Sequence, residues 1–354
     1  MKNNLVVVGM SGGVDSAASA LLLKQQGYQP VGCTLQLYRR ADHGCGSQRE
    51  AEDACTVAQQ IGIDFYLLDR MSDFEDKVIG DFIHTYCVGQ TPNPCIQCNR
   101  WIKFEALLQK ADELGAPYIA TGHYARVHFD EKESRWQLLR GLDRTKDQSY
   151  VLYPLSQKIL SRLLLPIGEF EKPTVRKIVE LEGLHNAHKP DSQDICFVPD
   201  GDYVDFLCSK GVSLLPGDFI DKNGHILGQH RGQVCYTTGQ RRGLGVSADR
   251  PLYVVQKNGH NNTVLLGDET DLYTRTVWAE DFNWVSLSPV SQSLRVTAKT
   301  RYSQREAAAT LYPEANGCVR VEFDEGQRAV TAGQSLVCYL DEMVVGGGII
   351  TRTE

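Results

Sequence analysis

The chain has 354 residues, a length that predicts two or three domains with a core large enough to fold without disulfides. Hydrophobic residues make up 42% and charged residues 23%, an ordinary composition for a soluble globular protein. The formal net charge of −7 argues against a protein that binds nucleic acid through an overall basic surface, so any RNA contact must use a local basic patch.

The start of the chain predicts a cytoplasmic protein. The apolar residues 5–8 begin a strand almost at the first residue and leave no room for a signal peptide. No apolar run is long enough to span a membrane. In the cytoplasm, the 11 cysteines are expected to be reactive or metal-binding more often than disulfide-bonded.

Residues 1–205 are predicted to form one α/β domain, because short apolar strands alternate with helical patterns. The expected strands are 5–8, 30–37, 65–68 and 118–121, and the expected helices are 15–26, 47–61, 74–88 and 102–114. A hairpin at 125–129 and 135–140 and two helices at 149–164 and 172–182 complete the domain. Such alternation favours a parallel sheet covered by helices on both faces.

The pattern changes after residue 205. Glycine and proline break residues 206–271 into short pieces, which predicts a small central domain. Residues 272–354 contain short alternating runs separated by turn signals, as at 294–300 and 319–323. They are therefore predicted to form an all-β, barrel-like C-terminal domain.

The loop V-G-M-S-G-G-V-D-S joins the first strand to the first helix. Gly12 and Gly13 allow a tight turn, and the unpaired N–H groups at the helix start attract an anion. Ser11 and Ser16 add hydroxyl donors, and Asp15 is either a helix cap or a magnesium ligand. The loop lacks the Gly-Lys-Ser/Thr of a Walker A motif and resembles the PP-loop of the ATP pyrophosphatases, which split ATP between its α- and β-phosphates. A glycine-rich turn that binds nothing is the plainer alternative.

Two polar loops carry a second signal, a set of three cysteines. Pro92 and Pro94 are expected to keep the chain extended and to exclude a helix there. Cys95 and Cys98 follow just before a helix start, which favours the thiolate by lowering the thiol pKa, and Cys196 lies in the second loop. Three thiols are too few for a closed zinc site, but two could form a reversible disulfide and three could hold an iron–sulfur cluster with one iron open. Burial as small apolar side chains is the simpler alternative.

The other cysteines carry weaker signals. Those in strand or helix patterns are expected to be ordinary buried side chains, and they are Cys33, Cys55, Cys87, Cys208, Cys318 and Cys338. Cys45 and Cys235 fit either reading.

A local basic stretch occurs in the predicted central domain. Residues 223–248 contain no Asp or Glu but include Arg231, Arg241, Arg242, His225 and His230. RNA contact and a solvated loop that lacks acids by chance explain this stretch equally well.

Several motifs in a fixed order point to one family. The chain resembles the tRNA-specific 2-thiouridylases, the MnmA family, along nearly its whole length. The matching segments are 9–16, 91–104, 120–126, 146–150, 191–197, 236–245 and 299–302. Such a set is far more specific than any single motif.

The resemblance implies a reaction. With ATP and magnesium, the family adenylates O2 of the wobble uridine (position 34) of tRNA, and enzyme-carried sulfur then replaces AMP to give 2-thiouridine. Cys196 would carry the sulfur as a persulfide, and Cys98 would release it by closing a Cys98–Cys196 disulfide. The sulfur would come from a cysteine desulfurase relay or from sulfide.

The resemblance also implies ligand contacts. Those to ATP would be made by Gly9, Met10, Ser11, Gly12, Gly13, Val14, Asp15, Ser16, Leu35 and Gly122. The target base would lie against Asn93, Pro94 and Cys95, and the rest of the tRNA against His123, Lys146, Asp147, Gln148, Arg301, Tyr302 and Gln334. From the residues alone, His123 is better explained as a buried structural histidine and 146–148 as a turn.

Cys95 departs from the family, since many members have an aspartate there to which an acid/base role is assigned. A thiol with an ordinary pKa of about 8.5 replaces it only where its surroundings lower that pKa. The change also supplies a third thiolate, so a [4Fe-4S] cluster held by Cys95, Cys98 and Cys196, with sulfide on the open iron, competes with the persulfide route. Leu35 replaces a common methionine and keeps an apolar wall for adenine. A superfamily ligase acting on a small molecule is the alternative function, but it leaves the three cysteines without a role.

Overall fold

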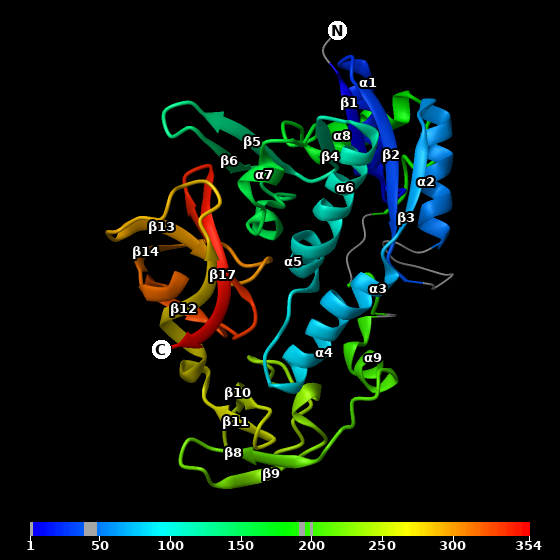
Figure 1. Ribbon diagram of the computed structural model, residues 1–354. Coiled ribbons are helices and arrows are strands. Elements are labelled where there is room, and N and C mark those ends of the chain that lie inside the picture. The colour runs from blue at the N-terminus through cyan, green and yellow to red at the C-terminus, as the bar shows by residue number, and fades with distance from the viewer. Residues whose placement is uncertain (1–2, 39–47, 191–194, 199–200) are drawn as a thin grey trace.

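The computed structural model describes residues 3–38, 48–190, 195–198 and 201–354. Figure 1 shows three regions: helices around a sheet at the N-terminal end, a small sheet at the bottom of the view, and a β-barrel beside the chain's C-terminus. This is the predicted succession of an α/β region, a small central region and a barrel. In the described ranges no helix is both long and apolar enough to cross a bilayer.

The first sheet is parallel and has the order β3-β2-β1-β4-β7. Its strands are β1 (Leu5–Gly9), β2 (Gln29–Gln36), β3 (Phe65–Asp69), β4 (Tyr118–Thr121) and β7 (Leu163–Leu164). The strand order turns back at β1, because β2 pairs on one of its sides and β4 on the other. Open α/β sheets bind ligands at the carboxyl end of such a strand, so this topology directs attention to the loop after β1.

Helices cover both faces of this sheet, as predicted. They are α1 (Val14–Gln25), α2 (Gln48–Ile61), α6 (Phe104–Leu114) and α8 (Lys172–Leu181). Val6 and Val8 share a core with α1, α2 and α8, whereas Val7 packs with α6. Successive strand residues point to opposite faces, which is why β1 reads as a continuous apolar run. Ser47, the expected cap of α2, lies outside the described residues.

Two long helices each contain a π-helical turn. The first runs through α3 (Met71–Phe74), η1 (Glu75–Ile79) and α4 (Gly80–Cys87). The second runs through α5 (Pro94–Cys98), η2 (Asn99–Lys103) and α6. The prediction that Pro94 excludes a helix was therefore wrong. Proline fits the first helical position, and the Asn93 side chain caps the helix by accepting from the Ile96 N–H.

The single helix predicted at 149–164 is also wrong. The segment forms η3 (Ser149–Leu152), α7 (Gln157–Leu160) and the short strand β7. Pro154 stands between the two helical turns, where a continuing helix would lack a hydrogen bond and clash with the ring. Ser156 then caps α7 by accepting from the Ile159 N–H.

The central region begins with α9 (Tyr203–Ser209). Its four-stranded sheet has the order β10-β11-β8-β9. The strands are β8 (Gly217–Ile220), β9 (Ile226–His230), β10 (Tyr253–Asn258) and β11 (Thr263–Gly267), with the 3-10 turns η5 (Gln233–Cys235) and η6 (Glu269–Leu272).

The C-terminal region is an antiparallel barrel. Its strands are β12 (Tyr273–Asn283), β13 (Leu294–Lys299), β14 (Ala307–Pro313), β15 (Val319–Arg328), β16 (Ser335–Leu340) and β17 (Met343–Thr353), with the turn η7 (Ala315–Gly317). The barrel closes because β12 pairs with both β15 and β17. Closure leaves these strands without a free edge and encloses the apolar interior.

One hairpin crosses between regions. The strands β5 (Ala125–Asp130) and β6 (Arg135–Arg140) form the hairpin predicted within the first domain. However, β6 pairs with β17 of the barrel, and the Arg140 N–H donates to the Glu342 carbonyl. A sheet that runs from the barrel into this hairpin was not predicted, because the pairing joins segments about two hundred residues apart in sequence.

Candidate active site

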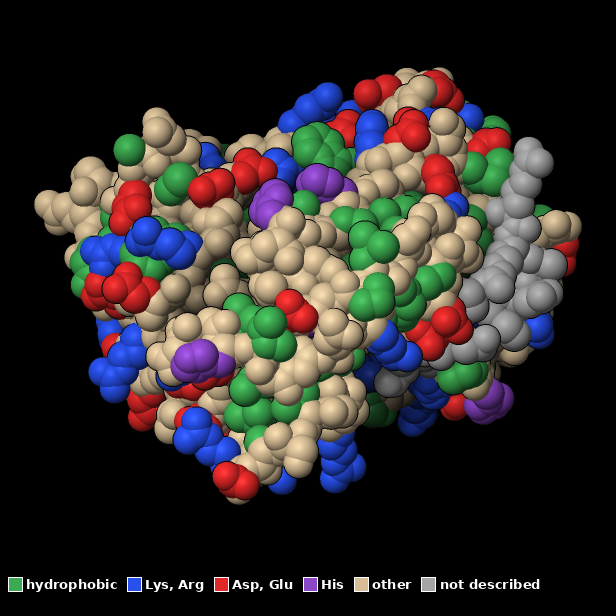
Figure 2. All heavy atoms as spheres, turned by 90° about the horizontal axis from the view of Figure 1, so that it is seen from below, with side chains coloured by type: hydrophobic (Ala, Val, Ile, Leu, Met, Phe, Trp, Pro, Cys, Tyr) green, Lys and Arg blue, Asp and Glu red, His purple; other side chains and the backbone are tan. Residues whose placement is uncertain are grey.

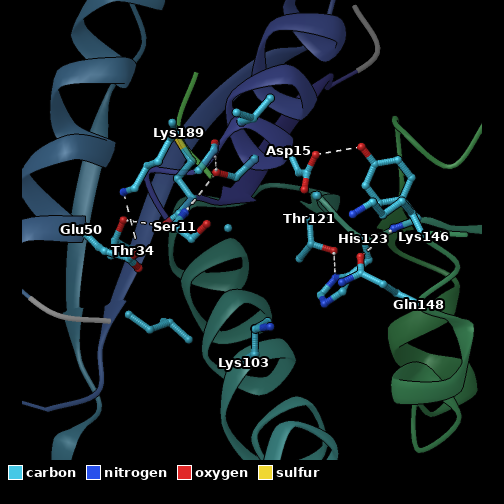
Figure 3. A pocket seen from close by; sticks show the side chains of 18 of the residues that line it. Ser11, Asp15, Thr34, Glu50, Lys103, Thr121, His123, Lys146, Gln148 and Lys189 are labelled. Carbon is cyan, nitrogen blue, oxygen red and sulfur yellow. Dashed lines mark hydrogen bonds and ion pairs between the residues drawn. The ribbon is translucent and has the colours of Figure 1, made fainter. Parts of the chain in front are cut away.

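A cavity of about 510 Å³ lies at the carboxyl end of β1, a size typical of small-ligand sites. Figure 3 shows side chains from several elements converging on it. From the expected ATP contacts it is lined by Gly9, Met10, Ser11, Gly13, Val14, Asp15, Ser16, Leu35 and Gly122. From the expected tRNA contacts it is lined by His123, Lys146, Gln148 and Tyr302. One cavity therefore unites residues from both predicted sets.

The phosphate loop is held in shape by short local contacts. Gly12 has a φ of +69°, and a side chain there would meet Asp53 and Glu50 at 2.8 Å. Gly13 is the N-cap of α1. The Ser16 hydroxyl accepts from the Ser11 N–H at 3.2 Å and donates to the Gly13 carbonyl at 3.1 Å. The hydroxyl of Ser16 thus shapes the loop, while the first N–H groups of α1 point to the cavity side.

Asp15 is not the cap of α1, because Gly13 occupies that position. Its carboxylate instead contacts two partners that were not predicted from the sequence. Lys172 Nζ lies 2.8 Å from both carboxylate oxygens, and the Tyr124 hydroxyl donates to Oδ1 at 2.8 Å. Gly122 permits this closeness, since a side chain there would meet the Asp15 backbone at 2.7 Å.

A second set of side chains supports the phosphate loop from the other side. Asn186 Nδ2 donates to the Gly12 carbonyl at 3.2 Å. Lys189 Nζ lies 2.8 Å from an Asp53 carboxylate oxygen and 3.7 Å from Glu50, and both Lys189 and Glu50 line the cavity. Sequence reasoning missed these residues, although Lys189 stands directly before the segment that carries Cys196.

His123 combines the two roles considered for it. It is buried, its Nδ1 lies 2.8 Å from the Thr121 hydroxyl, and its ring stacks on Phe104. Burial holds the pKa of the imidazole well below its usual range, and the positive charge of Lys103 adds to this effect. A neutral ring therefore faces the cavity at neutral pH.

The predicted turn at 146–148 lies two residues earlier, at 144–146, and the segment 146–148 has one inward-facing and two cavity-facing side chains. Lys146 and Gln148 line the cavity, and Gln148 Oε1 also accepts from the Tyr124 N–H at 3.0 Å. Asp147 instead accepts from the backbone of Gly141 and from both the N–H and hydroxyl of Ser149. Its carboxylate has a structural role in this structure.

The barrel contributes three expected tRNA contacts in different ways. Tyr302 lines the cavity and packs edge-on against Tyr150. Arg301 donates to the Ala329 carbonyl. Gln334 Nε2 donates to the carbonyls of Thr91 and Pro92 at 3.1 and 3.0 Å. Gln334 thus holds the segment directly before α5.

The two cysteines of α5 occupy different surroundings. Cys98 is buried in a hydrophobic cluster that also holds Ile102 and Phe197. Cys95 keeps exposed surface, but protein atoms crowd its sulfur. The resulting desolvation raises the pKa of the Cys95 thiol, and the Lys103 ammonium opposes that rise. The expectation that the helix start lowers this pKa was therefore wrong at Cys95.

Cys196 packs against the same cluster as Cys98. The Tyr38 hydroxyl donates to the Cys196 carbonyl at 2.6 Å, and Tyr38 directly follows the cavity-lining residue Leu37. Leu35 also belongs to both the cavity wall and the cluster. The two thiols are thus held in the apolar cluster that backs one wall of the cavity.

The three candidate cluster ligands do not gather. Within the residues that the structure describes, no group of three or more His, Cys, Asp or Glu side chains is arranged to hold a metal ion. Cys95 and Cys98 are three residues apart on α5, but Cys95 keeps exposed surface whereas Cys98 is buried in the apolar cluster with Ile102. In the described part of the chain the three thiols therefore form no ligand set for a [4Fe-4S] cluster.

The remaining cysteines were predicted with mixed success. Cys33 and Cys338 are fully buried, as expected, and Cys55 and Cys318 are partly buried. Cys87 and Cys208 are exposed, so burial was the wrong expectation for them. They lie near the ends of α4 and α9, where the outer side of a helix meets solvent. Cys235 is buried, and Cys45 lies outside the described residues.

The acid-free stretch separates into structural and exposed parts. His230 is buried and its Nε2 lies 3.1 Å from the Asn262 carbonyl, and the exposed His225 pairs with Asp221. Arg241 and Arg242 are exposed and remain candidates for RNA contact. Figure 2 views the molecule from the end where the central region lies, and basic side chains are scattered over that face among apolar and acidic ones.

Comparisons with known proteins agree along the whole chain. Residues 4–200 match the family described as tRNA methyl transferase HUP domain, residues 204–268 its PRC-barrel domain, and residues 274–350 the aminomethyltransferase beta-barrel domain. The chain is 47% identical to the tRNA-specific 2-thiouridylase MnmA of Acetivibrio thermocellus, over 99% of this chain and 100% of that protein. It is 46% and 45% identical to the proteins of that name from Clostridium perfringens and Clostridioides difficile, in each case over 99% of both chains. The chain therefore belongs to the MnmA family of tRNA-specific 2-thiouridylases.

Proposed function

We propose that this protein is an ATP-dependent enzyme that converts the wobble uridine of tRNA to 2-thiouridine. The observation that carries the proposal is the shared cavity: the phosphate loop and the expected tRNA contacts His123, Lys146, Gln148 and Tyr302 line it together, and its wall packs on the cluster that holds Cys98 and Cys196. Among the family descriptions, methyl transfer has no role for a phosphate loop with two cysteines behind its cavity wall, whereas thiolation uses both.

ATP would bind with its β- and γ-phosphates on the first N–H groups of α1 and the loop from Gly9 to Ser16. Leu35 would form an apolar wall for adenine, and Gly122 leaves room at the start of α1. Magnesium, when bound, would screen the negative charge of the phosphates. Asp15 is the nearest carboxylate for it, and Lys172 would have to release one of its oxygens.

The tRNA would place its target uracil at the part of the cavity that is lined by Lys103, His123 and Tyr302. Asn93, Pro94 and Cys95 would lie along the base, with Lys146 and Gln148 at the entrance. Asp147, Arg301 and Gln334 would support the site mainly by holding its backbone, given their bonds within the protein. The neutral His123 imidazole would contact the base without adding a charge.

The chemistry would run in two steps. First, uridine O2 attacks the α-phosphorus of ATP, and the bond from that phosphorus to pyrophosphate breaks. Second, the terminal sulfur of a Cys196 persulfide attacks C2, and AMP leaves with O2. The Cys98 thiolate then attacks Cys196 Sγ, the bond to the transferred sulfur breaks, and 2-thiouridine forms together with a Cys98–Cys196 disulfide. A thiol reductant must restore the two thiols before a desulfurase relay reloads Cys196.

The arrangement of thiols supports the persulfide route over the cluster route. Cys98 and Cys196 share one apolar cluster, whereas Cys95 faces the side of Lys103 and its thiol pKa is raised. We also propose a cytoplasmic protein with catalytic, central and barrel domains at 1–205, 206–271 and 272–354.

A reconstituted reaction tests the proposal. The protein is incubated anaerobically with ATP, magnesium, tRNA and either a cysteine desulfurase with cysteine or sulfide, and the nucleosides are analysed by mass. With the desulfurase and cysteine we expect 2-thiouridine and tRNA-dependent pyrophosphate release, whereas sulfide is two electrons short of a persulfide and should not load the Cys196 thiol. Pyrophosphate release without tRNA, in the presence of an amino acid, would instead identify a small-molecule ligase. Activity that requires bound iron would overturn the persulfide route but would leave the proposed tRNA thiolation intact.

A further inference from the structure

Four lysines line the cavity, and one of them stands apart. Lys172 and Lys189 are held by carboxylates, and Lys146 also interacts with a neighbouring group. Across the described part of the chain, no hydrogen bond or ion pair engages the ammonium of Lys103, the fourth of them. Figure 3 shows Lys103 rising from its helix toward the pocket. A cation left uncompensated in a cavity wall is suited to an anionic ligand.

The helix fixes where this ammonium lies. Cys95, Asn99 and Lys103 are spaced by four residues, so they occupy one side of the continuous helix through α5 and η2. Asn99 anchors this side, because its Nδ2 donates to the Val151 carbonyl at 3.0 Å. The Lys103 charge acts on both the Cys95 thiol and the His123 imidazole. Lys103 therefore stands at the base-binding end of the cavity, not among the residues that clamp the phosphate loop.

Only one group of the substrates must reach both ends of the cavity. In the first step the α-phosphorus of ATP is bonded to pyrophosphate, which the phosphate loop holds, and is attacked by uridine O2. In the second step the same phosphate leaves C2 as part of AMP. Negative charge develops on its oxygens in both steps, and a fixed ammonium stabilises such charge in a partly water-excluded site.

We propose that Lys103 is a further catalytic residue, which binds the α-phosphate during adenylation of uridine and during departure of AMP. This inference rests on the proposed function. The half-buried side chain and the neighbouring apolar Leu107 reduce the water that would otherwise screen the charge.

Single-turnover adenylation of tRNA by the full chain tests the role. We expect Lys103→Met to slow tRNA-dependent pyrophosphate release by about 100-fold or more, the usual effect of removing one charge-stabilising donor. Lys103→Arg keeps the charge and should recover part of the rate. Binding of ATP and of tRNA should change by less than about threefold, because the contact strengthens in the transition state. Lys110→Met, seven residues along the same helix, is the matched control and should behave as wild type.

A thio-substituted ATP tests the contact between Lys103 and the α-phosphate directly. With ATP that carries sulfur at a non-bridging α-oxygen, the wild-type enzyme should slow more than Lys103→Met does, since the variant has already lost the contact. An equal slowing in both proteins, or a normal adenylation rate in Lys103→Met, would overturn the role. A drop in tRNA affinity that matches the drop in rate would also overturn it, in favour of a backbone contact. If Lys103→Met fails to fold, the role is tested with Lys103→Arg instead, by its adenylation rate and by how much the thio-substituted ATP slows it. Absence of tRNA-dependent pyrophosphate release in the wild type would contradict the proposed function instead.

Discussion

The two ends of the cavity are built on different principles. The nucleotide end comes from one continuous stretch, β1, the phosphate loop and the start of α1, and its shape depends on backbone and hydroxyl contacts within a few residues. The thiol end is the apolar cluster behind the wall formed by Leu35 and Leu37; it is assembled from α5, the segment around Cys196 and the central region, and Gln334 of the barrel holds the chain just before α5. A local motif can therefore carry nucleotide binding, whereas sulfur transfer needs the whole fold. The predictions below separate the two ends.

The largest effect is expected at the thiol end. Cys196→Ala should abolish formation of 2-thiouridine, because the proposed route loads the sulfur on Cys196, and burial raises the pKa of the other cavity-lining thiol, Cys33, to about 12. Adenylation should continue, since the nucleotide end is complete without this residue. Nucleoside mass analysis and pyrophosphate release measure the two steps separately. Cys208→Ala, which alters an exposed thiol, is the control and should keep both activities. Thiolation by Cys196→Ala would end its role as carrier.

A nearly equal effect is expected at the nucleotide end. Asp15→Asn should lower the adenylation rate by about 100-fold, while tRNA binding stays within threefold, because Lys172 and the phosphate region lose a fixed negative partner. Lys172→Met should also be slow, since it removes the positive charge beside the half-buried Asp15 carboxylate and leaves the Tyr124 hydroxyl as its neutral partner. The loss of adenylation activity in the double variant, expressed as a free energy, should be much smaller than the sum of the two single losses. This is expected for two groups that act as one unit. Additive losses would separate their roles.

A smaller effect tests the contact between the barrel and α5. Gln334→Ala removes two hydrogen bonds to the Thr91 and Pro92 carbonyls, each worth about 1 kcal/mol. We expect thiolation to fall by about 10-fold at saturating tRNA, with little change in tRNA affinity. Filter binding and saturation kinetics distinguish this from the direct tRNA contact that the family resemblance implies. A loss confined to tRNA affinity would favour the direct contact.

The smallest effect concerns the apolar backing of the thiol end. Lys257 is buried 5.5 Å from the ring of Tyr86, a member of the cluster that holds Cys98, and its Nζ has no hydrogen-bond partner among the described residues. Burial lowers the pKa of Lys257 from 10.5 to about 8. The folded state then gives up its proton before the unfolded state does, so stability should rise between pH 8 and 10.5.

The same lysine can be replaced to measure that penalty. A shift of this size corresponds to a cost of about 3 kcal/mol at neutral pH. Lys257→Met should therefore raise the melting temperature at pH 7 and remove the rise in stability above pH 8, with both catalytic steps unchanged. Thermal unfolding at several pH values checks this, and a lower melting temperature at pH 7 would show that the ammonium has a stabilising partner.

Sequence reasoning succeeded where the determinants are local. The apolar run of β1, the glycines at 12 and 13 and the alternating strands of the barrel each carry their structure in a few neighbouring residues. It failed at Pro94, because proline both excludes a helix interior and starts a helix, and only the Asn93 cap distinguishes the two cases. It could not find the partners of Asp15, since Lys172 lies 157 residues away. The raised pKa of Cys95 likewise depends on surroundings assembled by the fold.

The hairpin of β5 and β6 connects the barrel to the cavity wall that contains His123. His123 and Tyr124 stand between β4 and β5, and β6 is joined edge to edge with β17, so one run of chain leads from the cavity to the barrel. A chain cut before residue 272 would leave Leu139 and its neighbours on an open strand edge, ready to pair with another molecule. The β17 edge therefore both shields that strand from other molecules and fixes the position of the chain that carries the imidazole.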